Sequence, residues 1–270
     1  MKIYYFALFA FVFTNIKAQF CEPRYIELNL PALKNPKILQ ALSNTYYIIG
    51  VKNKSTLVFT EIESEGQIIQ TNEINYTDTI ELKEASITKD GNILVLTNHY
   101  KNNRFHKSRV LKLNTLGNQI WESIDTNVIL VNFAETNDNQ FILIGDNYFR
   151  HFHFSDCSII KLNNNGQNKN VINFRKIFLN PQITAGNEIK SINITSDYKV
   201  YFSFVEKESL ASSAGIVGKN YLATTDTSFK NISFIELPGN DDYVSENHFI
   251  KTYGSNKISI SLKPNRGGFD

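Results

Sequence analysis

The residues whose chemistry is easiest to recognise are a group of histidines and a cysteine between positions 99 and 157. They are His99, His106, His151, His153 and Cys157. Imidazole nitrogen and thiolate sulfur are donors that Zn²⁺ or Cu²⁺ accepts. On an extended segment, His151 and His153 would point their imidazoles the same way. No pair has a recognised metal-ligand spacing, so the pattern favours the alternative, in which these are solvent-facing histidines in long loops.

Motifs for catalysis are absent from the sequence. It has no Gly-x-Ser-x-Gly, no His-Glu-x-x-His, no phosphate-binding glycine loop and no paired-carboxylate signature. The turn Asp90-Gly91-Asn92 matches no calcium loop and is explained by turn chemistry. We therefore assign no catalytic residue and no cofactor. The small-residue segment 209–218 is an insertion that could form a binding loop, with flexible decoration as the alternative.

Short apolar runs recur along the chain, each preceded by a polar turn. The runs are Tyr46–Ile49, Ile93–Leu96, Phe141–Ile144, Val200–Phe204 and Ile258–Leu262. Because they occur in a common phase, they indicate an internal repeat.

A glycine marks a second position in the first three copies of this repeat. Gly66, Gly117 and Gly166 each follow an apolar residue by four positions. A glycine there supplies the positive φ that closes a tight hairpin between two strands. The fourth copy has Phe229 in the corresponding stretch and lacks the glycine.

The repeat predicts the fold class. Each copy divides into four short strands rich in Val, Ile, Tyr, Phe and Thr. Four strands recurring about every 40–60 residues are typical of propeller blades. We predict an all-β fold, a β-propeller of four-stranded antiparallel blades in about five copies, the last incomplete. The repeats are placed at about 37–80, 81–126, 127–180, 181–242 and 243–270. A β-sandwich or an open solenoid is the alternative, but a sandwich does not explain a glycine at a steady period.

A family resemblance rests on the second copy. The turn Asp90-Gly91-Asn92 precedes an apolar strand and a Lys-Leu-Asn-x-x-Gly-Asn-x-x-Trp motif that ends at Trp121. This pattern resembles the repeats of large secreted bacterial propeller-type proteins, over roughly residues 37–240. The resemblance implies the fold and export, and no shared catalytic residues. Many such proteins end in a C-terminal surface-sorting domain, which this sequence does not show.

The N-terminus predicts export. Lys2 precedes the apolar run Ile3–Phe13 and the small residue Ala18, a pattern typical of a signal peptide. We predict a signal peptide at 1–18 and a single repeat domain at 19–270, secreted or at the cell surface, with the periplasm left open. No membrane span is expected after cleavage. Cys21 leaves a lipid anchor open, and in an oxidising compartment it could form a disulfide with Cys157.

The closure of the ring is also left open. Residues 24–30 alternate like a strand and could pair beside the fifth copy, which lacks its last two strands. Such pairing would hide two exposed edges. The alternative is a shortened propeller with an open edge.

The net charge of the chain bears on which classes of partner it could bind. The formal charge is +2, with basic and acidic residues interspersed, so nothing favours nucleic acid. The leading hypothesis is an exported, non-enzymatic propeller whose loops bind a protein or a glycan. A truncated propeller paralogue without independent activity is one alternative. A hydrolase- or lyase-type enzyme with its site in the propeller channel is another, because such sites are assembled from scattered residues.

Overall fold

In the computed structural model the described residues are 32–41, 44–147, 157–167, 170–173, 187–195, 197–209, 216–230, 232–237, 247–253 and 257–263. These residues form strands and turns and contain no helix. Accordingly, no helix among them is long and apolar enough to cross a membrane. The predicted signal peptide 1–18, the segment 24–30, His151 and His153 lie outside the described residues.

The strands form four antiparallel four-stranded sheets and one two-stranded sheet, each ordered as the chain runs. Blade 1 contains β1 (Lys34–Gln40), β2 (Thr45–Lys52), β3 (Thr56–Glu63) and β4 (Ile68–Asn75). Blade 2 contains β5 (Thr79–Ile87), β6 (Ile93–Lys101), β7 (Arg104–Leu113) and β8 (Gln119–Asp125). Blade 3 contains β9 (Val128–Glu135), β10 (Phe141–Asn147), β11 (Cys157–Leu162) and β12 (Asn170–Asn173). Blade 4 contains β13 (Asn187–Ile194), β14 (Lys199–Ser209), β15 (Ile216–Asp226) and β16 (Ser233–Glu236), and blade 5 contains β17 (Asn247–Tyr253) and β18 (Lys257–Lys263).

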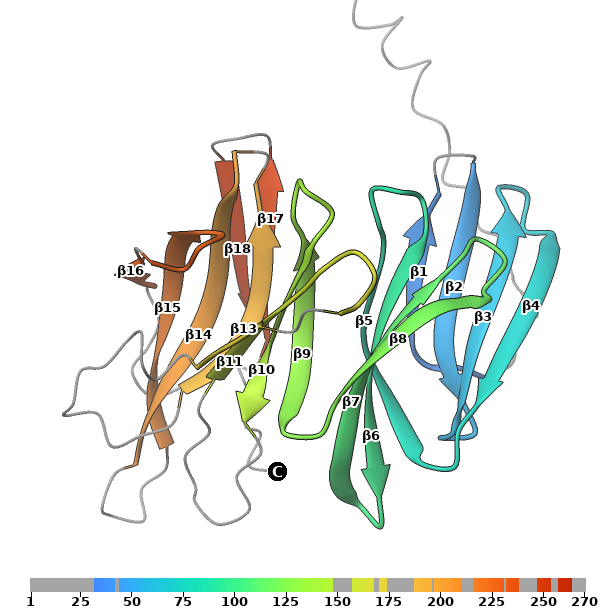
Figure 1. Cartoon of the computed structure of the whole chain (residues 1–270), viewed down its shortest axis with the longest axis horizontal. Coiled ribbons are helices and arrows are strands. Elements are labelled where there is room, and N and C mark those ends of the chain that lie inside the picture. The colour runs from blue at the N-terminus through green and yellow to red at the C-terminus, as the bar shows by residue number, and fades with distance from the viewer. Residues whose placement is uncertain are drawn as a thin grey trace, which may run out of the picture. The chain divides into compact units, whose positions relative to one another are not determined.

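Successive blades pack face to face, and Figure 1 shows the sheets following one another in chain order. The first strands of neighbouring blades contact each other, from β1 against β5 through to β13 against β17. A separate apolar cluster lies between each pair of neighbouring blades. This arrangement of stacked four-stranded units is the predicted propeller architecture, with two strands described in the last copy.

The second strand of blade 2 shows why these runs are uniformly apolar. Ile93 and Val95 belong to the core shared with blade 1, whereas Leu94 and Leu96 belong to the core shared with blade 3. All four side chains are fully buried. Because successive residues of a strand point to opposite faces, a strand covered on both faces must be apolar at every position.

The hairpin turns confirm the role of the repeated glycines. Gly66, Gly117 and Gly166 have φ values of 89°, 75° and 74°. In each turn the glycine N–H donates to the carbonyl three residues earlier, as in Gly117 to Asn114 at 2.9 Å. In blade 4, Phe229 takes the corresponding place with φ 56°, and its side chain is buried among the apolar residues between blades 3 and 4. That buried packing accompanies a backbone conformation that is uncommon for an aromatic residue.

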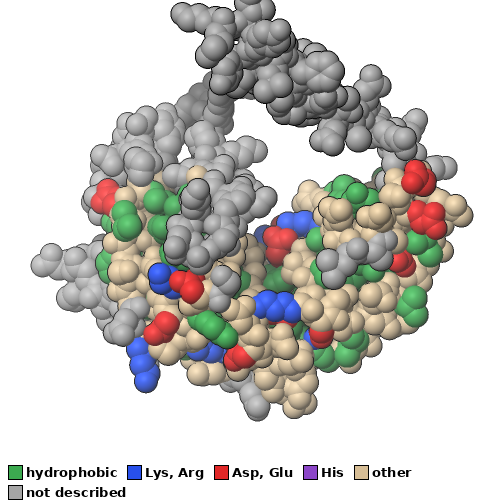
Figure 2. Space-filling view, turned by 90° about the horizontal axis from the view of Figure 1, so that it is seen from above, with side chains coloured by type: hydrophobic (Ala, Val, Ile, Leu, Met, Phe, Trp, Pro, Cys, Tyr) green, Lys and Arg blue, Asp and Glu red, His purple; other side chains and the backbone are tan. Residues whose placement is uncertain are grey.

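Charged side chains of both signs lie near one another on the surface. Figure 2 shows Lys and Arg side chains beside Asp and Glu side chains on the face that it draws. Lys37 contacts Glu84 at 3.1 Å and Lys52 contacts Glu73 at 3.0 Å. Such exposed or half-exposed pairs contribute little to stability, but they break up any field of a single sign.

Candidate functional site

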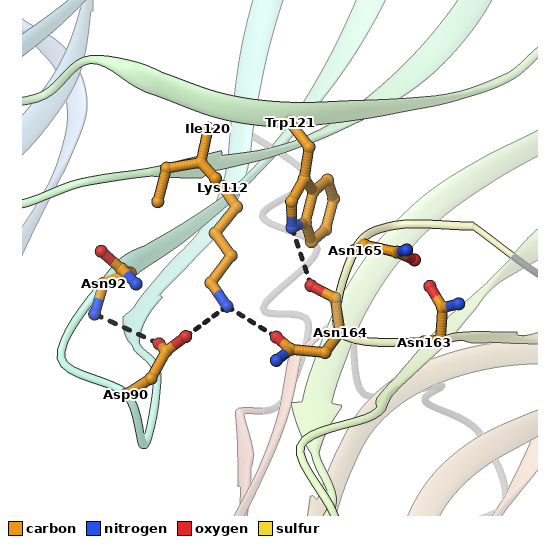
Figure 3. Close-up of a pocket in the computed structure, with 8 residues that line it drawn as sticks. All are labelled: Asp90, Asn92, Lys112, Ile120, Trp121, Asn163, Asn164 and Asn165. Carbon is orange, nitrogen blue, oxygen red and sulfur yellow. Dashed lines mark hydrogen bonds and ion pairs between the residues drawn. The ribbon is translucent and has the colours of Figure 1, made fainter.

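A pocket of about 540 Å³ lies between blades 2 and 3, and we call it the interblade pocket. Figure 3 shows the side chains that line it. They are Asp90, Asn92, Lys112, Ile120, Trp121, Asn163, Asn164 and Asn165. The first five come from the β5–β6 turn, the end of β7 and β8, and the three asparagines come from the β11–β12 turn. The volume is within the range typical of small-molecule sites.

An ion pair between a buried lysine and a more exposed aspartate lines the interblade pocket. Lys112 is 3 % exposed, and its Nζ donates to Asp90 Oδ2 at 2.6 Å and to Asn164 Oδ1 at 2.8 Å. Asp90 also accepts a hydrogen bond from Thr88 Oγ1 at 2.5 Å. Burial raises the pKa of Asp90, but the hydrogen bonds from Lys112, Thr88 and Asn92 outweigh it and lower that pKa to about 2. The carboxylate is therefore ionised at neutral pH.

Trp121 joins the two blades and also lines the pocket. Its Nε1–H donates to the carbonyl oxygen of Asn164 at 2.8 Å, and its ring lies 5.9 Å from that of Phe141. Blades 1 and 2 have an equivalent contact, in which Gln70 Nε2 donates to the carbonyl oxygen of Thr115 at 3.1 Å. At the interface of blades 2 and 3, the tryptophan thus takes the place that the glutamine amide has at the interface of blades 1 and 2. It adds an aromatic surface there that Gln70 does not provide.

Amide groups cover the opposite wall. The Asn163 and Asn165 carboxamides make no interaction with the other residues drawn in Figure 3. Asn163 Oδ1 accepts from the Gln167 backbone N–H at 2.8 Å, and its Nδ2 is a group that can donate. On the blade 2 side, Ile120 is 50 % exposed. The interblade pocket therefore combines apolar surface, amide donors and acceptors, and a single exposed carboxylate.

The candidate histidines lie in different environments. His99 lies in β6 and is fully buried, and His106 lies in β7 with its side chain 43 % exposed. The expectation that both lie in long loops is therefore wrong. The strand continues beyond the apolar run through Thr97, Asn98 and His99, whose polar side chains are buried. Cys157 begins β11, while His151 and His153 are outside the described residues.

The structure brings His99 and His106 together at one carboxylate. Their Nδ1 atoms lie 3.6 Å and 3.3 Å from Asp78 Oδ2, and Lys107 Nζ lies 3.4 Å from the same atom. In the β6–β7 pairing His99 is opposite Lys107 and Tyr100 is opposite Phe105, so His106 is an extra, bulged residue. A bulge allows the neighbours His106 and Lys107 to face the same group, which a regular strand would not.

This group of side chains does not have the character of a metal site. Across the described ranges, no three or more His, Cys, Asp or Glu side chains are arranged to hold a metal ion. The Lys107 ammonium lies 3.4 Å from Asp78 Oδ2, so the carboxylate is already paired with a cation. Burial of His99, followed by the nearby Arg109 guanidinium, lowers the pKa of His99 to about 4 against a smaller opposite effect of Asp78. His99 is therefore neutral at physiological pH.

The residues of the interblade pocket belong to predicted strands and turns of the repeat, and none of them is predicted from the sequence to form a site. Trp121 and the asparagines of the β11–β12 turn lie in copies two and three of that repeat. The signal that could have found the pocket is the tryptophan of one copy facing the asparagine-rich turn of the next. Recognising this signal would have required knowledge of how neighbouring blades stack.

Comparisons with known proteins show the fold. No protein-family model matches the chain, and no curated protein matches it. A polysaccharide lyase of family PL25, an ulvan lyase bound to a GlcA–Rha3S saccharide, superposes with a TM-score of 0.61 at 8 % identity, over 90 % of this chain and 65 % of that one. A monoclinic crystal form of an ACO/RPE65 chimera gives 0.50 at 12 % identity, over 84 % and 55 %. A mutant of Synechocystis apocarotenoid oxygenase gives 0.48 at 12 % identity, over 84 % and 54 %.

The chain spans about half to two thirds of the length of these structures. At such low identities a likeness establishes architecture and leaves activity open. The comparisons and the blade-by-blade packing agree that the chain is an all-β protein built as a β-propeller.

Proposed function

We propose that this chain is an exported, non-enzymatic propeller that binds a glycan in the interblade pocket. The observation that carries the proposal is the placement of Trp121 and Ile120 opposite the amides of Asn163 and Asn165 in one pocket. A sugar presents apolar C–H groups and hydroxyls that both donate and accept hydrogen bonds. Aromatic and aliphatic surface suits the C–H groups, and carboxamides suit the hydroxyls.

The charges of the described surface support a glycan over a polyanion. Lys112 is buried and bonded to Asp90, so it offers no open cationic surface to a phosphate backbone. Binding to nucleic acid depends on clustered Lys and Arg side chains that neutralise several phosphates. The mixed charges that Figure 2 shows do not supply such a cluster on that face.

The proposal is tested by removing one polar and one apolar contact. In Asn165→Ala and in Ile120→Ala, the affinity for the bound oligosaccharide is expected to fall about tenfold, or 1.4 kcal/mol, because each change deletes a ligand contact at an exposed position. Oligosaccharides are first identified on a glycan array and affinities are then measured by isothermal titration calorimetry. The melting temperature should change little in either variant.

Leu116→Ala is the matched control. Leu116 holds in the β7–β8 turn the position that Asn165 holds in the β11–β12 turn, and it is 53 % exposed and does not line the pocket. The Leu116→Ala variant should bind the oligosaccharide with the same affinity as the unmodified chain. The proposal fails if no glycan binds, or if a glycan binds with equal affinity to all these variants.

A further inference from the structure

The charge that the interblade pocket presents to a ligand is negative. Lys112 and Asp90 are formally balanced, but their side chains are 4 % and 36 % exposed. The ammonium donates to Asp90 and Asn164, and the aspartate is the more exposed side chain of the pair. The other side chains of the pocket are amides, an indole and an aliphatic group. A ligand therefore meets the aspartate and not the lysine.

The Asp90 carboxylate is also held in place. Thr88 Oγ1 donates to Oδ1 at 2.5 Å, the Asn92 backbone N–H approaches the same oxygen at 3.4 Å, and Lys112 donates to Oδ2. The equivalent aspartate of blade 3, Asp138, accepts from Thr136 Oγ1 in the same way. Of these two aspartates, Asp90 lines the interblade pocket and Asp138 does not.

The neighbouring charged residues Lys89 and Glu135 do not make the charge presented by the interblade pocket positive. Glu135 of blade 3 accepts from the Lys89 backbone N–H at 2.7 Å, and Lys89 Nζ donates to the Thr136 carbonyl at 3.0 Å and to Asn137 Oδ1. Burial, followed in the same direction by Asp90, raises the pKa of Glu135 against the effect of Lys89. The Lys89 ammonium is thus directed at backbone and amide oxygens of blade 3.

From this arrangement we infer that the interblade pocket selects neutral saccharides and rejects those that carry carboxylate or sulfate groups, with Asp90 as the residue that determines the selection. The inference rests on the proposed glycan-binding function and specifies its ligand class. A fixed carboxylate accepts hydrogen bonds from sugar hydroxyls and repels an anionic substituent in the same place. Because the pocket is partly open, this repulsion should weaken as salt is added.

The test compares sugars that differ only in charge. β-1,4-linked mannose tetramers are paired with β-1,4-linked mannuronate tetramers, and glucose tetramers with glucuronate tetramers, so that each pair differs by one carboxylate per residue. Affinities are measured by calorimetry at low and at high salt on the full chain. In at least one pair, the neutral member is expected to bind tenfold or more tightly than its uronate counterpart.

Asp90→Asn is the decisive variant. An asparagine has nearly the same shape and still accepts a hydrogen bond from Lys112, but it leaves the lysine charge unbalanced. The preference for the neutral sugar is expected to fall at least tenfold. Asp138→Asn is the matched control, since it alters the equivalent turn outside the pocket, and it should keep the preference.

The outcomes separate the two claims. If no glycan binds on the array or in these pairs, the proposed function is contradicted together with this inference. If the array yields a bound glycan but no member of either pair binds, glycan binding stands and this inference is overturned. If the uronate members bind as tightly as the neutral ones, or more tightly, glycan binding stands and the inference is overturned. If the preference exists but Asp90→Asn leaves it unchanged, Asp90 does not determine it and the inference is overturned as well.

Discussion

Replacing Gly166 with alanine is expected to lower the free energy of unfolding by about 3 kcal/mol, the sum of two separate costs. The first is conformational, since φ at Gly166 is 74° and a side chain disfavours that region. The second is steric, because a Cβ at Gly166 would lie 2.5 Å from Cε3 of Trp121. The ring is held by its bond to Asn164 and cannot simply move aside.

A substitution at Gly91 measures the conformational cost without the steric cost. Its φ of 79° is similar, but a Cβ placed there would meet nothing within 4 Å. Gly91→Ala should therefore lose only about 1 kcal/mol, the conformational part. Urea denaturation of both variants and of Gly117→Ala, where a Cβ would lie 2.5 Å from Cδ1 of Phe59, provides the comparison. Equal losses at Gly91 and Gly166 would show that close packing between blades is not what requires the glycine.

Acid is expected to destabilise the protein through His99. An unfolded histidine binds a proton near pH 6.5, whereas the buried His99 does so only near pH 4. Between these values the unfolded state binds more protons, so the free energy of unfolding falls as the pH is lowered. A shift of this size corresponds to about 3 kcal/mol lost between pH 7 and pH 4.

The measurement is a set of urea denaturation curves between pH 7 and pH 4 for the unmodified chain and for His99→Gln. Glutamine cannot be protonated, so the variant should lose less stability over this window by about 3 kcal/mol. His106→Gln is the control, because His106 faces the same Asp78 from a half-exposed position, and it should keep the acid-dependent loss. Parallel curves for the unmodified chain and His99→Gln would contradict the assignment.

The repeat and the turns could be predicted from the sequence because both are local. An apolar run such as Ile93–Leu96 reports that both faces of a strand are covered. A glycine such as Gly117 reports a positive φ within one hairpin. Neither feature requires knowledge of distant residues, and the repetition of both along the chain indicated four-stranded units. The all-β class and the blade order therefore followed from the sequence.

The ends of strands were less predictable because burial between blades is not local. Polar residues Thr97, Asn98 and His99 extend β6 and are fully buried there. Asn98 Nδ2 donates to the carbonyl oxygen of Leu130 in blade 3 at 3.0 Å, which satisfies a polar group that would otherwise be costly to bury. Without that partner in view, the end of the apolar run looked like the end of the strand.

The repeating unit, the turn glycines and the all-β class can be read from the residues alone, since each follows from periodicity or from one residue's φ. Which side chains meet across the blades depends on how the sheets pack. Asp90 and Lys112 meet through the pairing of strands within blade 2, and Asn164 joins them because blade 3 stacks on blade 2. Such contacts depend on the register and packing of whole sheets, and the residues that make them carry no local mark of their future neighbours.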